Sequence, residues 1–202
     1  MSCIITITRD YGAGGRSVAR RVAQELGIEV YDRDIIRNTA RDSGLDSGVV
    51  EREEEEISRA DAFLRMITPA AYVDRREAIH EIERKVILML ADKGPCVIVG
   101  RCADVILEEA NMECLNVFLY ADMLHRAVRV GELIGTQNPT EVQKAMKRTD
   151  SARRYYYQQF TGRHWGDYQN YHLMLDTGRL GYETCVRAIC DAARHFDGGQ
   201  EV

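Results

Sequence analysis

The stretch that decides the fold is CIITITRDYGAGGRSVARRVAQELG, residues 3–27. Residues 3–8 are apolar or β-branched on both alternating faces, which favours a strand that is buried on both sides. A glycine-rich turn follows at residues 12–15. From Ser17 onward apolar residues recur at helical spacing until Gly27, a residue typical of a helix C-terminus. The stretch therefore predicts a strand, a glycine loop and a helix in direct succession.

The rest of the chain repeats the alternation of strands and helices. Further buried strands are predicted at residues 28–31, 96–99, 115–119 and 171–175, and further helices at 75–92, 122–134, 140–160 and 182–193. We expect the third of these helices to open with a capping box formed by Thr140 and Gln143. Five short buried strands that alternate with helices predict an α/β fold, a parallel sheet with helices on both faces.

Length and composition predict one domain, residues 1–202, because an ordinary globular composition over 202 residues suits a single core. Within it, residues 36–83 look like a helical insertion. Its acidic run, Glu53 to Glu56, is most simply a solvated helix face, and metal or partner binding is the alternative.

Charge and patterning exclude several classes of function. The formal net charge of −5 disfavours broad nucleic-acid binding. The longest apolar stretches fall far short of the roughly 20 residues that span a bilayer, and the N-terminus does not resemble an export signal, so we expect a cytoplasmic protein without membrane contact. The six cysteines include no C-x-x-C pair and are expected to be reduced thiols. Oligomeric state is left open.

The glycine loop is the natural place for a phosphate group. Ligands of parallel sheets bind beyond the carboxyl ends of the strands, and glycines let backbone amides approach a ligand beside the positive end of the next helix. The alternative is a turn that merely connects two elements. The predicted phosphate-binding residues are Gly12, Ala13, Gly14, Gly15, Arg16 and Ser17.

Arginines on two later helices strengthen this hypothesis. Arg126 and Arg129 lie three residues apart and share a helix face, and Arg153 and Arg154 follow Asp150 on the next helix. Together they could bracket a polyphosphate and stabilise a phosphoryl group in transfer. Surface ion pairs with the many glutamates are the alternative.

Charged residues also follow the second and third strands. Arg101 could bind a phosphate in bidentate fashion, and Asp104 could accept from a base amino group or ligate metal-bound water. A salt bridge that caps the next helix is the alternative. Asp32 could polarise an attacking oxygen or hold hydrated magnesium, and a helix N-cap is its alternative role.

At this point the chain resembles the nucleoside monophosphate kinase group, and specifically the cytidylate kinase-like family. The matching motifs occur in the family's order over nearly the whole chain. They are Gly12 to Ser17, Gly100-Arg101, His125-Arg126-Ala127-Val128-Arg129, Asp150-Ser151-Ala152-Arg153 and Leu175-Asp176-Thr177. The resemblance implies a P-loop kinase-like core of residues 1–35, 84–135 and 168–202, a substrate-binding insertion at 36–83 and a lid at 136–167.

Two departures from the pattern of true cytidylate kinases stand out, and the first, in the loop, resembles a feature of the cytidylate kinase-like family. An ungapped match to the loop Gly-Ala-Gly-Lys-Gly-Thr puts Gly15 in the place of the phosphate-binding lysine, and Arg9 in the place of the first P-loop glycine. Either Arg16 or Arg9 supplies the missing charge from another direction, or nucleotide binding is altered. In addition, the Gly-Arg-Asp motif of the family is Gly-Arg-Cys here, and Asp104 is the nearest acid.

The leading hypothesis is an ATP- and magnesium-dependent kinase that phosphorylates a nucleoside monophosphate such as CMP or dCMP. Loop amides would hold the donor phosphates, Ser17 would reach magnesium, and five arginines would stabilise the transferring group. These are Arg16, Arg126, Arg129, Arg153 and Arg154. Asp32, Arg101 and Asp104 would seat the acceptor. The rival hypotheses are a non-catalytic nucleotide- or phosphate-sensing module and, less favoured, a nucleic-acid binder that uses the arginines and aromatics near residues 153–165.

Overall fold

The computed structural model describes residues 3–44 and 69–196. Five strands form one sheet in the order β2-β3-β1-β4-β5, and every neighbouring pair is parallel. The predicted five-stranded parallel sheet is therefore confirmed, with strand ends that shift by one or two residues. The strands are β1 (Ile4–Arg9), β2 (Glu29–Tyr31), β3 (Cys96–Val99), β4 (Cys114–Tyr120) and β5 (Leu173–Asp176).

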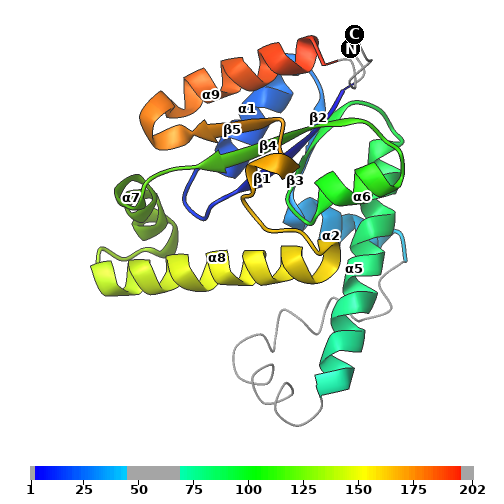
Figure 1. Ribbon diagram of the computed structural model, residues 1–202, viewed down its shortest axis with the longest axis horizontal. Helices are drawn as coiled ribbons and strands as arrows, with labels where there is room; N and C mark the ends of the chain where they lie inside the picture. Colours follow the sequence, from blue (N-terminus) through cyan, green and yellow to red (C-terminus); the bar gives the residue numbers. More distant parts are fainter. Residues whose placement is uncertain (1–2, 45–68, 197–202) are drawn as a thin grey trace.

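Helices cover both faces of this sheet (Figure 1). On one face lie α1 (Gly15–Leu26) and α9 (Thr177–Arg194), and on the other lie α2 (Arg33–Asp42), α5 (Pro69–Ala91) and α6 (Ala103–Glu109). Two more helices, α7 (Met123–Ile134) and α8 (Pro139–Thr161), pack against each other and cross beyond the carboxyl ends of the strands. A single 3₁₀ turn, η1 (Tyr168–Asn170), precedes β5.

Two hydrophobic cores follow from the alternation of side chains along the strands. Ile5 and Ile7 of β1 are fully buried against α1 and α9. Ile4, one residue away, and Ile98 of β3 enter the opposite core with α2, α5 and α6. Because both faces of each central strand are covered, these strands are apolar at consecutive positions instead of at every second one.

The N-terminus of α8 corrects one sequence prediction. The cap is Asn138, whose Oδ1 accepts from the Thr140 backbone N–H at 3.0 Å, so Thr140 lies inside the helix. Pro139 occupies the first helical position, where its missing N–H costs nothing. Asparagine is as good an N-cap as threonine, and the proline next to it was the stronger signal.

The predicted helical insertion is described only at its two ends, by α2 and α5. Helix α2 begins at Arg33, directly after β2, because the Asp32 side chain accepts from the N–H groups of Asp34 and Ile35. The acidic run Glu53 to Glu56 lies outside the described residues. Among the helices that are described, none combines the length and the apolar character needed to cross a bilayer.

Candidate functional site

The glycine loop joins β1 to α1 at the carboxyl edge of the sheet. Gly12 and Gly14 have φ values of 88° and 75°, which side chains rarely tolerate. Space excludes side chains there too: a Cβ on Gly12 would lie 2.7 Å from the Arg126 carbonyl oxygen, and one on Gly14 would collide with the Tyr182 ring. At Gly12 and Gly14 the loop therefore consists of backbone alone, and it lies at the positive end of α1, which suits a phosphate group.

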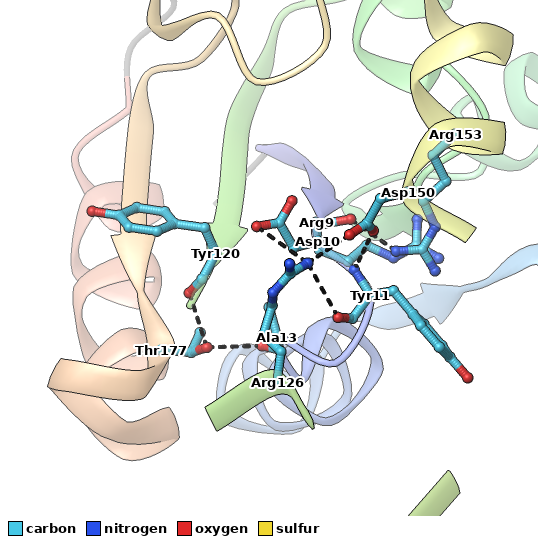
Figure 2. A network of polar contacts seen from close by, with 9 residues as sticks. All are labelled: Arg9, Asp10, Tyr11, Ala13, Tyr120, Arg126, Asp150, Arg153 and Thr177. Carbon is cyan, nitrogen blue, oxygen red and sulfur yellow. Dashed lines mark hydrogen bonds and ion pairs between the residues drawn. The ribbon is translucent and has the colours of Figure 1, made fainter. Parts of the chain in front are cut away.

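Two helices contact this loop, α7 through Arg126 and α8 through Asp150 and Arg153 (Figure 2). The Tyr11 N–H donates to Asp150 Oδ1 at 2.8 Å, and Arg126 Nη1 donates to Asp150 Oδ2 at 2.6 Å. Arg153 Nη1 donates to the Arg9 carbonyl oxygen at 2.9 Å. The motifs on α7 and α8 thus bring Arg126 and Arg153 to the loop, where the sequence placed them.

Thr177 anchors the other side of the loop. Its buried hydroxyl lies 3.0 Å from the Ala13 carbonyl oxygen and 3.1 Å from that of Tyr120 (Figure 2). The hydroxyl links the loop to the ends of β4 and β5. The sequence offered Thr177 only as part of a motif, because nothing local to residue 177 points to a contact with residue 13.

Asp10, inside the loop, is a site residue that the sequence analysis missed. Its carboxylate lies 3.7 Å from Arg126 Nη1. Burial raises the pKa of Asp10 to about 6, and the nearby Asp150 adds to this, while Arg126 opposes it. A carboxylate in a phosphate-binding loop is the reverse of what an anion site needs, so sequence reasoning had no cause to single it out.

Arg9, the last residue of β1, runs across the start of α1. A Cβ on Gly15 would lie 2.6 Å from Arg9 Cγ, and one on Gly100 would collide with Arg9 Nη1. Within residues 3–44 and 69–196, no carboxylate forms a salt bridge with Arg9. Burial, followed by the charges of Arg153, Arg16 and Arg101, holds the pKa of Arg9 well below its ordinary value.

Arg16 points to a different part of the edge, the end of β2. Its Nε lies 3.3 Å from Asp32 Oδ2, and its Nη2 lies 2.7 Å from Asp34 Oδ2. The Arg16 side chain is 50% exposed, whereas Asp32 is buried. Asp32 therefore fills its alternative role as an N-cap and also faces a cation.

Arg101, after β3, belongs to a compact polar network. Arg101 Nε lies 3.1 Å from Glu83 Oε1, and the guanidinium stands 5.5 Å from the centre of the Tyr156 ring. The Tyr156 hydroxyl donates to Glu83 Oε2 at 2.8 Å. The sequence predicted Arg101 but missed Glu83, which at 1% exposure is an acid inside the core.

Three further residues that were predicted for the site have their contacts elsewhere. Asp104 is 2% exposed and accepts from the Tyr157 hydroxyl at 2.7 Å, which corrects the expectation that it meets a ligand. Burial raises the pKa of Asp104, and α8 supplies the tyrosine that covers it. Arg129 pairs with Glu132 in solvent at 2.7 Å, and the Arg154 guanidinium stacks 5.7 Å from the Trp165 ring.

Ser17 lies in the first turn of α1, two residues after the helix begins. A hydroxyl oxygen at that place fits magnesium, which keeps several waters and is held through one or two protein oxygens and the phosphates of its nucleotide. The described residues contain no group of three or more His, Cys, Asp or Glu side chains that could hold a metal ion by themselves.

Comparison with protein families finds a match that covers most of the chain. Residues 4–179 match the model of the cytidylate kinase-like family. No curated protein matches the chain.

Solved structures match along almost the full length. An uncharacterized protein from Eubacterium ventriosum superposes with a TM-score of 0.72 at 24% identity, over 96% of this chain and 99% of that one. Shikimate kinase from Bacteroides thetaiotaomicron gives 0.52 at 16% identity, over 96% and 99%. The APS kinase of Mycobacterium tuberculosis, solved with AMPPNP and APS, gives 0.50 at 19% identity, over 95% and 98%. At these identities the likeness establishes a shared kinase fold.

Proposed function

This chain belongs to the cytidylate kinase-like family, and on that premise we propose that it transfers the γ-phosphoryl group of ATP to a small acceptor, a nucleoside monophosphate such as CMP or dCMP. One observation carries the proposal. The backbone loop that suits a polyphosphate is contacted directly by Arg126 and Arg153, which supports a role for both cations in stabilising the negative charge of a transferring phosphoryl group.

On the donor side, the N–H groups of residues 13–17 would bind the phosphates of ATP. Arg126 exchanges its bond to Asp150 for one to the transferring group, and Arg153 approaches the same group from α8. Arg153 is held at the loop before the substrate arrives, so Arg126 is the arginine that changes partner during the reaction.

On the acceptor side, the ends of β2 and β3 offer two cations with their acids, Arg16 with Asp32 and Arg101 with Glu83. An acceptor phosphate would be attracted mainly by Arg16, which is half exposed, because Glu83 already neutralises most of the charge of Arg101. Asp32, the less deeply buried of the two acids, would orient the acceptor. The acceptor site extends toward the helical insertion, whose described ends are α2 and α5.

Ser17 would hold magnesium together with the donor phosphates. Bound there, the ion would supply charge neutralisation between the β- and γ-phosphates. The residues of this chain orient the two substrates around it.

A coupled assay of ADP release tests the proposal. ATP and magnesium are supplied with CMP, dCMP, UMP, AMP and several hydroxyl-bearing acceptors in turn, and hydrolysis without acceptor is subtracted. We expect turnover with CMP or dCMP. Turnover only with a hydroxyl acceptor would keep the kinase but replace its substrate class.

The second candidate is a sensor that binds nucleotide without transferring phosphate, and Gly15 in the lysine position favours it. ATP would then raise the melting temperature while no acceptor yields ADP. That outcome would overturn the kinase proposal and leave phosphate binding intact.

A further inference from the structure

The backbone conformation of Gly15 does not explain why residue 15 is a glycine. Its φ is not positive, unlike those of Gly12 and Gly14, so its conformation is open to any residue. What excludes a side chain there is Arg9, whose Cβ, Cγ and Cδ would all lie within 3.1 Å of a Cβ on Gly15. Residue 15 is therefore glycine because the stem of Arg9 occupies the space above it.

The guanidinium at the far end of Arg9 reaches the end of β3. It stops against Gly100, where an added Cβ would collide with Nη1. Arg9 thus crosses the first residue of α1 and ends between the carboxyl ends of two neighbouring strands, β1 and β3. Arg153 fixes its backbone through the carbonyl oxygen at 2.9 Å.

Arg16, the other candidate for the missing lysine charge, is already occupied. It pairs with Asp34 and approaches Asp32, and half of its side chain is in solvent. Arg9 forms no salt bridge with the described carboxylates. Arg9 is held by packing and lies beyond salt-bridge range of the described acids. The charges of Arg153, Arg16 and Arg101 act on it more strongly than the opposing charge of Asp32, so it has a charge that an anion can neutralise.

We propose that Arg9 and Gly15 have exchanged roles relative to the usual P-loop, in which a glycine stands at the position of Arg9 and a lysine at the position of Gly15. Here Arg9 supplies the cation for the donor phosphates, and Gly15 supplies the space that the Arg9 side chain crosses. The inference rests on the proposed function, since it needs a polyphosphate on the loop. It makes Arg9 a phosphate-binding residue and assigns Arg16 to the acceptor side.

Binding of inorganic tripolyphosphate, measured by calorimetry without metal, tests the exchange apart from catalysis. We expect Arg9→Met to weaken binding roughly 10- to 100-fold, as loss of a charged hydrogen-bond donor does, and to lower the salt dependence of binding. Arg9→Lys should retain most of the affinity. Arg187→Met, which removes an exposed arginine on α9, is the matched control and should leave the affinity unchanged.

A double variant provides the sharper test. Gly15→Lys alone should weaken binding, because its side chain would collide with the Arg9 stem. Arg9→Gly combined with Gly15→Lys should restore affinity to within about threefold of wild type, because the charge returns by the usual route. A residue that matters only for folding would not be rescued in this way.

The outcomes separate the two proposals. If the wild-type chain binds neither tripolyphosphate nor ATP, the proposed function fails. If the wild type binds and folded Arg9→Met binds equally well, the exchange is overturned and the proposed function stands. If Arg16→Met alone abolishes binding, the charge belongs to Arg16 and the exchange is again overturned.

Discussion

Arg9 and Arg101 stand at the ends of two neighbouring strands, β1 and β3, and the protein treats their charges in opposite ways. Arg101 is paired with the buried carboxylate of Glu83, which the Tyr156 hydroxyl also supports. Arg9 forms no salt bridge with any described acid, and the charges of Arg153, Arg16 and Arg101 lower its pKa more than Asp32 raises it. A buried charge is tolerated when a partner neutralises it, so Arg101 is complete without a ligand and Arg9 is not. The charge of Arg101 thus contributes to the fold, whereas the charge of Arg9 is available to bind an anion.

Removing Glu83, the partner of Arg101, should have the largest effect on stability. Glu83→Ala leaves Arg101 without its carboxylate in a site where the arginine side chain is only 15% exposed. We expect the free energy of unfolding in urea to fall by about 3 kcal/mol or more. Glu132→Ala, which removes an exposed pair with Arg129, is the control and should change stability by less than about 1 kcal/mol. Similar effects of the two changes would mean that the Glu83 pair is not structural.

Arg126 combines both behaviours, because it is paired with Asp150 and yet lies on the loop. If phosphate replaces that partner during the reaction, Arg126→Ala should lower kcat about a hundredfold, close to 3 kcal/mol. It should also lower the melting temperature, because the partly buried Asp150 loses its cation. Arg129→Ala, one turn further along α7, should lower kcat much less, because Arg129 pairs with Glu132 in solvent. Equal losses of kcat would restore the role that the sequence gave to Arg129.

The buried carboxylate of Asp10 should make the stability of the protein depend on pH. Its pKa of about 6 in the folded chain exceeds the ordinary 3.8, so the folded state holds the proton more tightly than the unfolded state. The stabilisation is complete below pH 3.8 and is lost as pH rises through 6. At pH 7.5 we therefore expect Asp10→Asn, which keeps the carboxyl's shape without its charge, to be more stable than wild type by about 2 kcal/mol. The gain should shrink as urea unfolding is repeated toward pH 4, and a constant difference would refute the titration of Asp10.

Much of the fold could be predicted because its signals are local. Buried strands are largely apolar runs, and β1, β2 and β3 are each followed directly by an aspartate or a glycine at the sheet edge. Arg126 and Arg153 were also predictable, because each lies on a predicted helix in a short motif that resembles one of the family. These features depend on residues within a few positions of one another.

The rest of the site depends on contacts between residues far apart in the chain. Glu83 meets Arg101 and Tyr156 across 18 and 73 residues, and Asp104 is covered by Tyr157, 53 residues away. No spacing rule reports such pairs, so an acid in α5 looked like any solvated glutamate and Asp104 looked free to meet a ligand. The same holds for Gly15, whose reason lies in the side chain of Arg9 and not in its own backbone.

The smallest predicted effect concerns Arg9, and it decides whether the fold needs the charge of this side chain. If Arg9 carries a charge that the fold does not need, Arg9→Met should keep the stem's packing over Gly15 and leave the free energy of unfolding unchanged or raise it by about 1 kcal/mol. Adding tripolyphosphate should then reverse the order, because a ligand stabilises the chain that binds it more tightly. Thermal unfolding of both proteins, with and without tripolyphosphate, measures this crossing. A variant that is less stable than wild type by more than about 1 kcal/mol without any anion would show that Arg9, like Arg101, has its partner within the fold.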